Sequence, residues 1–245
     1  MSREHAPTGK KIIIIGASSG IGRELALRYL ERGHTVGITG RRAEKLDEIR
    51  QQYPHLAHAK IMDVRSEESL SLLDELIRET RGVDLFIYNA GTGSQSKTLL
   101  PDIEMDTLHT NAVGFTRLVI RAYNHFKASG APGHIAVISS IAGIKPLDEA
   151  PAYSATKRYV THYTSCLARK ARRENIPLTF TTILPGFIRT ELLQRDYPLS
   201  ISLEKGARLI FRAIERGKRS VILPGRWRPI MLLARLIPGR LWEKM

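Results

Sequence analysis

Short runs of residues that favour β-strands alternate with longer segments of helical periodicity along almost the whole chain. The runs lie at 11–15, 35–39, 59–62, 84–88, 134–138, 179–183 and 220–223. Helical patterns fill the intervals near 21–32, 42–52, 67–80, 104–128, 152–174 and 203–217. Strands that alternate with helices are typical of crossover connections, so the rhythm predicts a doubly wound α/β domain with a parallel seven-stranded sheet and helices on both faces. No proline- or glycine-rich linker interrupts it, which predicts one domain over 1–224 and a separate tail at 225–245.

The composition is that of a globular chain with an uneven distribution of charge. Hydrophobic residues make up 42% of the 245 positions, and Cys166 is the single cysteine, which suits a reducing compartment. The sequence has no run of about 18 apolar residues and no apolar core near its start, so we expect a cytoplasmic protein. The net charge of +14 indicates an anionic partner, and nine basic residues against two acidic ones place half of this excess in 212–245.

A glycine-rich stretch, IIIIGASSGIG, joins the first predicted strand to the first predicted helix. Glycines at such a junction allow a sharp turn, leave room for a pyrophosphate and direct the N–H groups of the helix start toward its negative charge. Because the cluster stands between a strand and a helix of an alternating chain, it predicts a Rossmann-type dinucleotide site. The expected contacts are Gly16, Ser18, Ser19, Gly20, Ile21 and Gly22.

The residues about twenty positions beyond the glycines indicate which dinucleotide binds. An acidic residue there binds the ribose 2′-hydroxyl of NAD, whereas an arginine accepts the 2′-phosphate of NADP. This chain has Arg41 and Arg42 at that point and no carboxylate. The sequence therefore predicts NADP(H).

Five residues, YSATK, place Tyr153 and Lys157 four positions apart, on one face of a predicted helix. Together with the glycine turn they resemble the short-chain dehydrogenase/reductase family, with matches from about residue 10 to residue 223. The other matching positions, in chain order, are Asp63-Val64, Asn89-Ala90-Gly91, Asn111, Ser139-Ser140, Pro185-Gly186, Ile188 and Thr190.

The resemblance implies an enzyme that transfers hydride between NADP(H) and a carbonyl or alcohol substrate, with Asn111, Ser140, Tyr153 and Lys157 as the catalytic residues. In the family the serine stands about thirteen residues before the tyrosine, which favours Ser140 over Ser139. Ser140 would hold the substrate oxygen, and Lys157 would bind the nicotinamide ribose and join Asn111 in a water-linked proton relay. The cofactor contacts implied in the same way are Asp63, Val64, Asn89, Ala90, Gly91, Tyr153, Lys157, Pro185, Gly186, Ile188 and Thr190.

The positive charge of Lys157 gives a chemical reason for a lysine beside the phenol of Tyr153. A lysine ammonium and the positive ring of the oxidised cofactor both favour the phenolate, and moving the tyrosine pKa from about 10 to about 7 requires roughly 4 kcal/mol. Tyr153 would then serve as general acid when a carbonyl is reduced and as general base when an alcohol is oxidised. Because cellular NADP is mostly reduced, we expect carbonyl reduction.

Two positions depart from the family pattern. Ile15 stands where threonine is usual, and Tyr88 stands where an asparagine often precedes Asn89. Both residues end predicted neighbouring strands, so we expect an apolar strand-to-strand contact in place of a polar one. Such an exchange affects stability more than chemistry.

Partners are less clearly encoded than the cofactor. The eight histidines show no metal-ligand spacing, so no metal site is predicted. By resemblance, 187–205 covers the substrate, and the helices near 104–128 and 152–174 build a homodimer or homotetramer. Nucleic acid is not expected to bind, because half of the excess charge lies in an apolar-rich tail. A non-catalytic NADP-binding sensor or scaffold remains the alternative function.

The tail, GRWRPIMLLARLIPGRLWEKM at 225–245, combines apolar residues with arginines. Pro229 is expected to open a helix that Pro238-Gly239 ends. Its apolar stretch is too short to span a bilayer, which leaves two interpretations open. The helix either docks on protein or makes a peripheral contact with a membrane surface.

Overall fold

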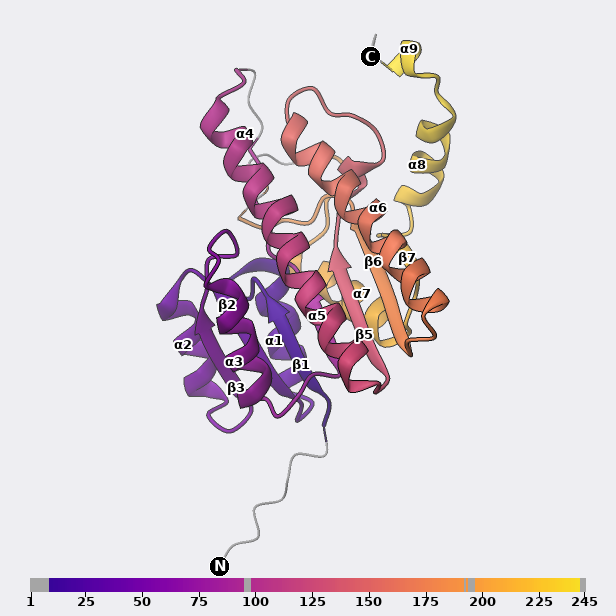
Figure 1. Cartoon of the computed structure of the whole chain (residues 1–245). Helices are drawn as coiled ribbons and strands as arrows, with labels where there is room; N and C mark the ends of the chain where they lie inside the picture. The colour runs from indigo at the N-terminus through magenta and orange to yellow at the C-terminus, as the bar shows by residue number, and fades with distance from the viewer. Residues whose placement is uncertain (1–8, 95–97, 192, 194–196, 243–245) are drawn as a thin grey trace, which may run out of the picture.

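A computed structural model describes residues 9–94, 98–191, 193 and 197–242, in a seven-stranded parallel sheet flanked by helices (Figure 1). The strands are β1 (Lys11–Ile15), β2 (Thr35–Gly40), β3 (Ala57–Ile61), β4 (Leu85–Tyr88), β5 (Gly133–Ile138), β6 (Leu178–Pro185) and β7 (Ser220–Leu223). The helices between them are α1 (Gly20–Leu30), α2 (Ala43–Gln52), α3 (Ser69–Glu79), α4 (Pro101–Leu108), α5 (Phe115–Ser129), α6 (Pro151–Arg173) and α7 (Leu203–Glu215). The predicted doubly wound fold is confirmed.

The sheet has the strand order β3-β2-β1-β4-β5-β6-β7, and every neighbouring pair is parallel. β1 and β4 lie side by side near the centre of the sheet. From β1 the chain adds β2 and β3 toward one edge, and from β4 it adds β5, β6 and β7 toward the other. Where the strand order reverses in this way, the loops after the two strands diverge and leave a crevice at the carboxyl ends. The glycine turn follows β1 and Asn89 follows β4, so the fold brings both predicted motifs to this crevice.

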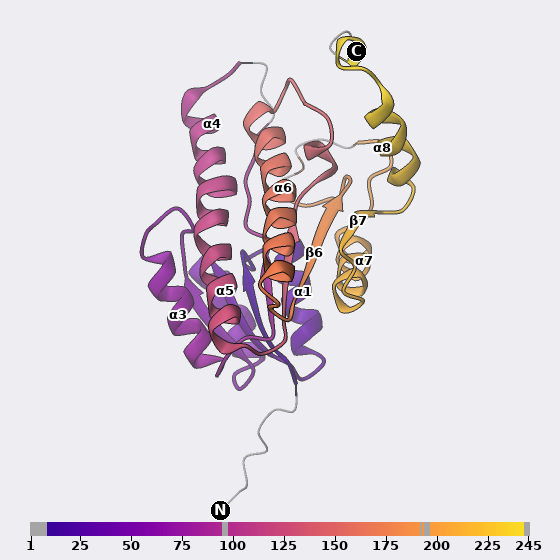
Figure 2. The same ribbon diagram turned by 45° about the vertical axis from the view of Figure 1, so that its right-hand side comes forward.

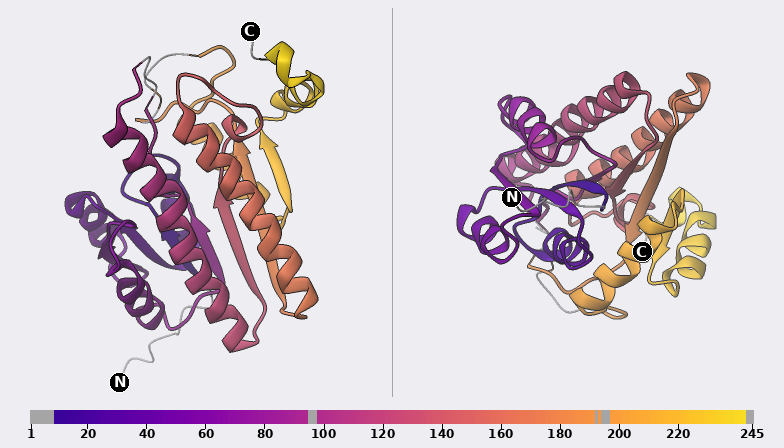
Figure 3. Two further views of the ribbon diagram at one scale, coloured as in Figure 1. Left: turned by 45° about the horizontal axis from the view of Figure 1, so that its top comes forward. Right: turned by 90° about the horizontal axis from the view of Figure 1, so that it is seen from below.

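Alternate residues of the central strands pack into two separate cores. Ile12 and Ile14 contribute to a core that includes residues of α1, α2 and α7, whereas Ile13 and Ile15 contribute to one that includes residues of α3, α5 and α6. All four isoleucines are completely buried. Successive side chains of a strand point to opposite faces, so a continuous apolar run is what a sheet covered on both sides requires. The view from below in Figure 3 shows the two layers of helices on either side of the sheet.

Two predicted elements differ from the structure. The third strand begins at Ala57 rather than near residue 59, because its pairing with β2 already starts at Ala57 and Val36. The helix predicted over 104–128 begins at Pro101 and is interrupted by a π-helical turn, η1 (His109–Gly114), between α4 and α5. A π-turn inserts one residue into the helix without breaking its hydrophobic face, so periodicity alone does not reveal it.

Beyond β7 the chain forms α8 (Trp227–Leu236) and a single turn, α9 (Gly239–Trp242), at the end of the molecule opposite the start of β1 (Figures 1 and 2). The predicted start of this helix was Pro229, and the structure places the start two residues earlier, at Trp227. Proline fits the first turn because the leading N–H groups of a helix have no acceptor within it. Within the described residues, no helix is long and apolar enough to cross a membrane.

Candidate active site

The glycine turn after β1 is shaped by backbone contacts that leave no space for side chains. Gly16 and Gly20 have φ angles of +84° and +54°, a region that favours glycine. A methyl group on Gly22 would lie 2.0 Å from the carbonyl oxygen of Gly16. The side-chain amide of Asn89 donates to that same oxygen at 2.7 Å, which ties the β1 and β4 loops together.

The start of α1 offers uncapped N–H groups to the crevice. Its N-cap residue, Ser19, makes no side-chain hydrogen bond to the helix, and Ser19, Gly20 and Ile21 line a cleft. Thr190, from the loop after β6, lies across from Gly20, with its side chain 3.7 Å from where a Gly20 methyl would stand. Free helix N–H groups beside glycine backbone are the donors that a pyrophosphate needs, so this site fits a dinucleotide.

Arg41 and Arg42, which follow β2, lie near the glycine turn and differ in whether they form an ion pair. Ser18 packs against Gly40, where a methyl would be 2.8 Å from its Cβ, so the turn directly adjoins the arginines. Arg42 forms an ion pair with Glu191 at 2.9 Å. Arg41 is exposed and makes no ion pair with any residue that the structure describes. Arg41 is therefore the freer of the two to meet a phosphate.

The predicted adenine-side acid is already engaged. Asp63 accepts hydrogen bonds from the backbone N–H and the guanidinium of Arg65, which keep the pKa of the Asp63 carboxyl below its usual value. Arg65 also contacts Asp106 of α4. The next residue, Val64, packs by its backbone against the π-turn, since a methyl on Gly114 would lie 2.7 Å from its carbonyl oxygen.

The π-turn carries Asn111 to the centre of the site. The Asn111 amide donates to the Thr92 carbonyl at 2.7 Å and to the Thr156 hydroxyl at 3.1 Å, and its oxygen accepts from the Thr92 N–H at 2.8 Å. A methyl on Gly91 would be 3.3 Å from that oxygen and 3.2 Å from Nζ of Lys157. Asn111 thus holds the segment after Asn89 and Ala90 close to Lys157, while the predicted water-linked relay stays a prediction.

The two serines after β5 have different surroundings. Ser139 is buried, donating to the Lys157 carbonyl at 2.8 Å and sharing a hydrogen bond with Thr161 at 2.7 Å. Ser140 accepts from the Ala142 N–H at 3.1 Å, and its hydroxyl is close enough to Tyr153 to act against the rise of the tyrosine pKa; both side chains line the same cleft. The hydroxyl of Ser140 is therefore the one beside the tyrosine, as the family spacing suggested.

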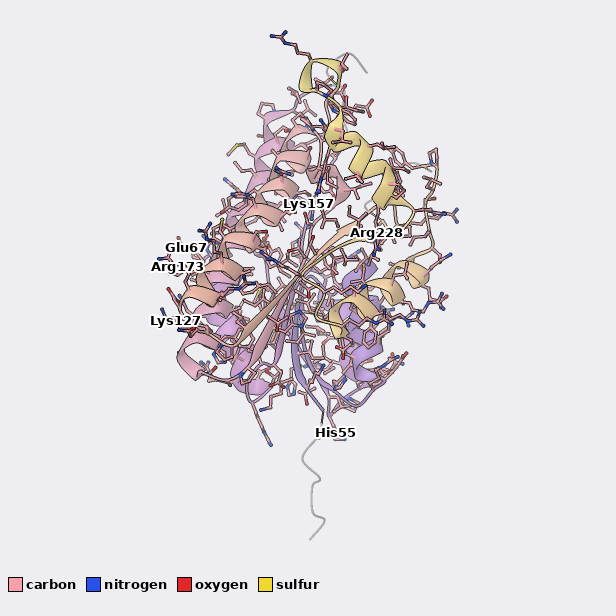
Figure 4. The ribbon with its side chains drawn as sticks, turned by 90° about the vertical axis from the view of Figure 1, so that its right-hand side faces the viewer. His55, Glu67, Lys127, Lys157, Arg173 and Arg228 are labelled. Carbon is pink, nitrogen blue, oxygen red and sulfur yellow. The ribbon has the colours of Figure 1, made fainter. Side chains whose placement is uncertain are left out.

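Tyr153 and Lys157 lie one turn apart on α6, with the ammonium nitrogen 5.5 Å from the centre of the tyrosine ring. Lys157 donates to the Ile138 carbonyl at 3.1 Å and points into the middle of the molecule (Figure 4). Burial raises the pKa of Tyr153, and the Ser140 hydroxyl opposes this rise. Burial also lowers the pKa of Lys157 to about 8.

In the chain without cofactor, burial raises the Tyr153 pKa; the predicted lowering, which includes the charge of the oxidised cofactor, stays a prediction. Removing water disfavours the charged form of both groups, so the phenol and the ammonium shift in the directions that keep them neutral. Lys157 stands over the face of the Tyr153 ring.

The departures at Ile15 and Tyr88 form one contact. The two residues are register partners in β1 and β4 and belong to the same core. The prediction of an apolar contact holds for their packing, but Tyr88 keeps one polar interaction, donating to the Thr110 carbonyl at 3.1 Å. That bond anchors the π-turn beside Asn111.

A cleft of about 400 Å³ joins these groups to a second, apolar region. Its lining includes Pro185, Gly186, Ile188 and Thr190, whose predicted contact with the nicotinamide stays a prediction. The sequence reasoning missed much of the rest of this wall, which is formed by Ile141, Lys145, Leu147, Tyr197, Trp227, Met231, Ala234 and Trp242. Of the 187–205 segment, residues 192 and 194–196 lie outside the described part of the chain.

The C-terminal segment belongs to this wall. Trp227, Met231 and Ala234 follow helical spacing on one face of α8, and that face lines the cleft. Trp227 meets Phe187 edge to face at 5.4 Å between ring centres, and Phe187 stacks on Tyr197 at 4.2 Å. The spacing of 227, 231 and 234 was the one sequence signal that could have identified this wall.

No group of three or more histidine, cysteine, aspartate or glutamate side chains within the described residues is arranged to hold a metal ion. The prediction that the protein uses no metal stays a prediction. The helix start, the glycines and the two arginines instead offer donors for phosphate groups.

Comparison with known proteins agrees with this geometry. The family described as "short chain dehydrogenase" matches residues 10–198. The chain is 32% identical over 249 residues to 11-beta-hydroxysteroid dehydrogenase-like 2 of Arabidopsis thaliana, covering 94% of this chain and 79% of that protein. It is 31% identical over 195 residues to farnesol dehydrogenase of Aedes aegypti, covering 76% and 80%. The solved structure of ElxO with NADP bound has a TM-score of 0.77 at 21% identity, covering 88% and 97%, which supports the fold.

Proposed function

The chain belongs to the short-chain dehydrogenase family of oxidoreductases, and we propose that it reduces a carbonyl compound to an alcohol with NADPH. The observation that carries this proposal is the meeting of Ser140, Tyr153 and Lys157 in a cleft that also contains the open start of α1. One cleft then offers donors for a dinucleotide and a hydroxyl pair for a carbonyl oxygen.

The proposed cofactor contacts run along one side of the cleft. The α1 start and the glycine turn would hold the pyrophosphate, Arg41 and Arg42 the 2′-phosphate, and Asp63 with Val64 the adenine side. Asn89 to Gly91, Lys157 and the loop from Pro185 to Thr190 would surround the nicotinamide half. When bound, NADPH supplies the hydride.

The chain's own residues would handle the proton and the charge. Tyr153 would donate its phenolic proton to the carbonyl oxygen as that oxygen becomes an alkoxide. The Ser140 hydroxyl, which lines the cleft together with the tyrosine, would bind the same oxygen and stabilise its growing negative charge. The Lys157 ammonium would then stabilise the phenolate that is left behind, which explains why it stays buried beside the ring.

We propose that the substrate is largely apolar. Beyond the catalytic residues, the cleft is lined mainly by aliphatic and aromatic side chains, and the Lys145 ammonium is occupied by the carbonyl of Ile237 at 2.7 Å. An unpaired polar group of a substrate would lose its hydration there without gaining a partner. Two of the relatives are named for a hydroxysteroid and for farnesol, which agrees with this preference.

The test is the Tyr153→Phe variant with Tyr163→Phe as its control. Both tyrosines lie on α6, but Tyr163 packs by its ring against Phe115 and does not line the cleft. We expect Tyr153→Phe to lose at least about 10³-fold in the rate of NADPH oxidation with a carbonyl substrate while binding NADPH as before. Tyr163→Phe should remain close to wild type.

The alternative is a protein that binds NADP without turnover. It predicts tight NADPH binding, no oxidation on a broad carbonyl panel, and no difference between the two tyrosine variants. The presence of Ser140, Tyr153 and a buried Lys157 in one cleft favours the enzyme, because a sensor has no need of that set.

We also propose a homodimer through the face formed by α4, α5 and α6. Leu108, Val113 and Tyr159 are exposed there, by 40%, 43% and 38%, and they line a shallow hollow. An exposed apolar hollow between helices is typical of an association surface. Val113→Glu should give monomers in light scattering, whereas unchanged mass would contradict this surface; a wild-type mass of four chains would indicate the tetramer.

A further inference from the structure

The C-terminal helix α8 has an outer face that is as apolar as its inner one. Trp227, Met231 and Ala234 face the cleft, and the opposite side carries Leu232, Leu233 and Leu236, which are 61%, 64% and 73% exposed. Leu241 of α9, 56% exposed, extends the same apolar surface. We call the side chains of Leu232, Leu233, Leu236 and Leu241 the outer leucine face.

This face is held in a fixed position. The Lys145 ammonium donates to the Ile237 carbonyl at 2.7 Å, and the Trp242 indole donates to the Pro146 carbonyl at 3.0 Å. Before the helix, the Arg226 guanidinium donates to the Leu199 carbonyl at 2.6 Å. The segment is thus docked on its own subunit by one face, which is the first of the two interpretations from the sequence, and that docking leaves the other face to solvent.

Three arginines are interspersed with the outer leucine face. Arg228, Arg235 and Arg240 are exposed, and their guanidinium groups make no hydrogen bond or ion pair with any part of the chain that the structure describes. Arg228 lies at the outer side of the molecule in Figure 4. Residues 225–242 contain no aspartate or glutamate, so the surface combines apolar side chains with uncompensated positive charge.

The charge decides between a second copy of the chain and an anionic surface. In a two-fold contact, each face meets its own copy, so these arginines would approach the same arginines with no acidic partner. An anionic lipid surface gives each of them a counter-charge and gives the leucines an acyl region to enter. A helix of ten residues is about 15 Å long, half the thickness of a hydrocarbon core, so it must lie along the surface.

We propose that the outer leucine face, with Arg228, Arg235 and Arg240, docks the protein on a bilayer that contains anionic lipid. The opposite face of the same helix is a wall of the cleft, so docking brings that wall next to the bilayer. This inference concerns a binding surface and does not depend on the proposed carbonyl reduction.

The test is co-sedimentation of the full-length protein with vesicles of phosphatidylcholine alone or mixed with phosphatidylserine. We expect binding to the mixed vesicles that weakens with added salt. The triple variant R228Q/R235Q/R240Q should bind roughly 100-fold more weakly, since each basic residue near an anionic surface contributes on the order of fivefold. The matched control R216Q/K218Q/R219Q removes three exposed charges near the start of β7, away from the cleft, and should bind like wild type.

A second pair of variants separates the leucines from the charges. Leu233→Glu and Ile61→Glu each replace a side chain that is more than 60% exposed. Only Leu233→Glu should lose vesicle binding, by tenfold or more. Absence of binding by the wild type, equal loss in both charge variants, or a change of oligomeric state in Leu233→Glu in place of lost vesicle binding would overturn the proposal.

Discussion

The two ends of the cleft are built in different ways. The proposed cofactor end is made of backbone that follows β1, β2 and β4, and a methyl group on Gly22 would lie 2.0 Å from the Gly16 carbonyl oxygen, so no larger residue fits there. The substrate end is made of side chains from the loop after β5, the loop after β6 and α8, joined by contacts such as that between Lys145 and Ile237, 92 residues apart. Because the first end depends on backbone geometry, we expect it to tolerate few substitutions. At the second end, side chains can be replaced one at a time.

The largest effect on NADPH affinity is expected from Gly22→Ala, at the proposed cofactor end of the cleft. Its methyl group would meet the Gly16 carbonyl oxygen at 2.0 Å and the Asn89 side-chain amide at 2.6 Å, and the Gly16 backbone cannot yield as a flexible side chain would. We expect NADPH affinity to fall by about 100-fold, the upper range for an overpacked site. Fluorescence titration measures this, with Gly225→Ala as the control, because nothing lies within 4 Å of that position. Equal NADPH affinities in the two variants would show that close packing at Gly22 does not shape the cofactor site.

The arginines should produce the next largest effect. Losing a charge-assisted contact to phosphate costs roughly 10- to 100-fold in affinity, so Arg41→Ala should weaken NADPH but leave NADH unchanged. Arg42→Ala should cost less, because Arg42 must first leave Glu191. Parallel titrations with both cofactors measure the effect. A variant in which both affinities fall together would show that Arg41 does not contact the 2′-phosphate.

The buried lysine gives a prediction for pH dependence. Because burial lowers the Lys157 pKa from 10.5 to about 8, the group becomes neutral as pH rises through 8. We expect kcat/KM for reduction to fall about tenfold per pH unit above that point, since this parameter reports the free enzyme. A rate that stays constant to pH 10 would contradict the assignment.

The same shift has an independent signature in stability. Between pH 8 and 10.5 the unfolded chain holds more protons on this lysine than the folded chain does, so its contribution to the unfolding free energy rises with pH. Between pH 8 and 10.5, the unfolding free energy of the wild type, measured with urea, should rise relative to that of Lys157→Met by at most about 3 kcal/mol.

The smallest effect is expected at the substrate end. Trp227→Leu removes part of the aromatic wall but no hydrogen bond, because the indole N–H is buried without a partner among the described residues. We expect KM for an apolar carbonyl to rise by up to about tenfold while NADPH affinity stays the same. Ile230→Ala, on the exposed side of α8, is the control. An equal rise in both variants would show that the wall does not contact the substrate.

The difference between the two ends also explains what the sequence could predict. Strands such as β1 were recognisable because a sheet covered on both faces requires an unbroken apolar run. The glycines and arginines were recognisable because phosphate binding constrains residue types at fixed spacings. The structure brings these residues to one crevice, and their roles in binding and catalysis stay predictions.

Other features depend on tertiary contacts that have no spacing pattern. The π-turn at Asn111 leaves the helical periodicity of 101–129 unbroken, and the Thr92 contacts that accompany it are not visible in sequence. The rise that burial causes in the Tyr153 pKa was not visible in the sequence, because it depends on how completely the fold excludes water. The docking of α8 was one of two open interpretations, since both faces of that helix are apolar.

The central claim is that this cleft reduces an apolar carbonyl with NADPH. The most direct test is the initial rate of cofactor oxidation by the wild-type protein on a panel of aldehydes and ketones of increasing apolar size, run with NADPH and with NADH. The account predicts turnover with NADPH that exceeds turnover with NADH and increases with the apolar size of the substrate. Tight NADPH binding with no oxidation by any member of the panel would contradict it.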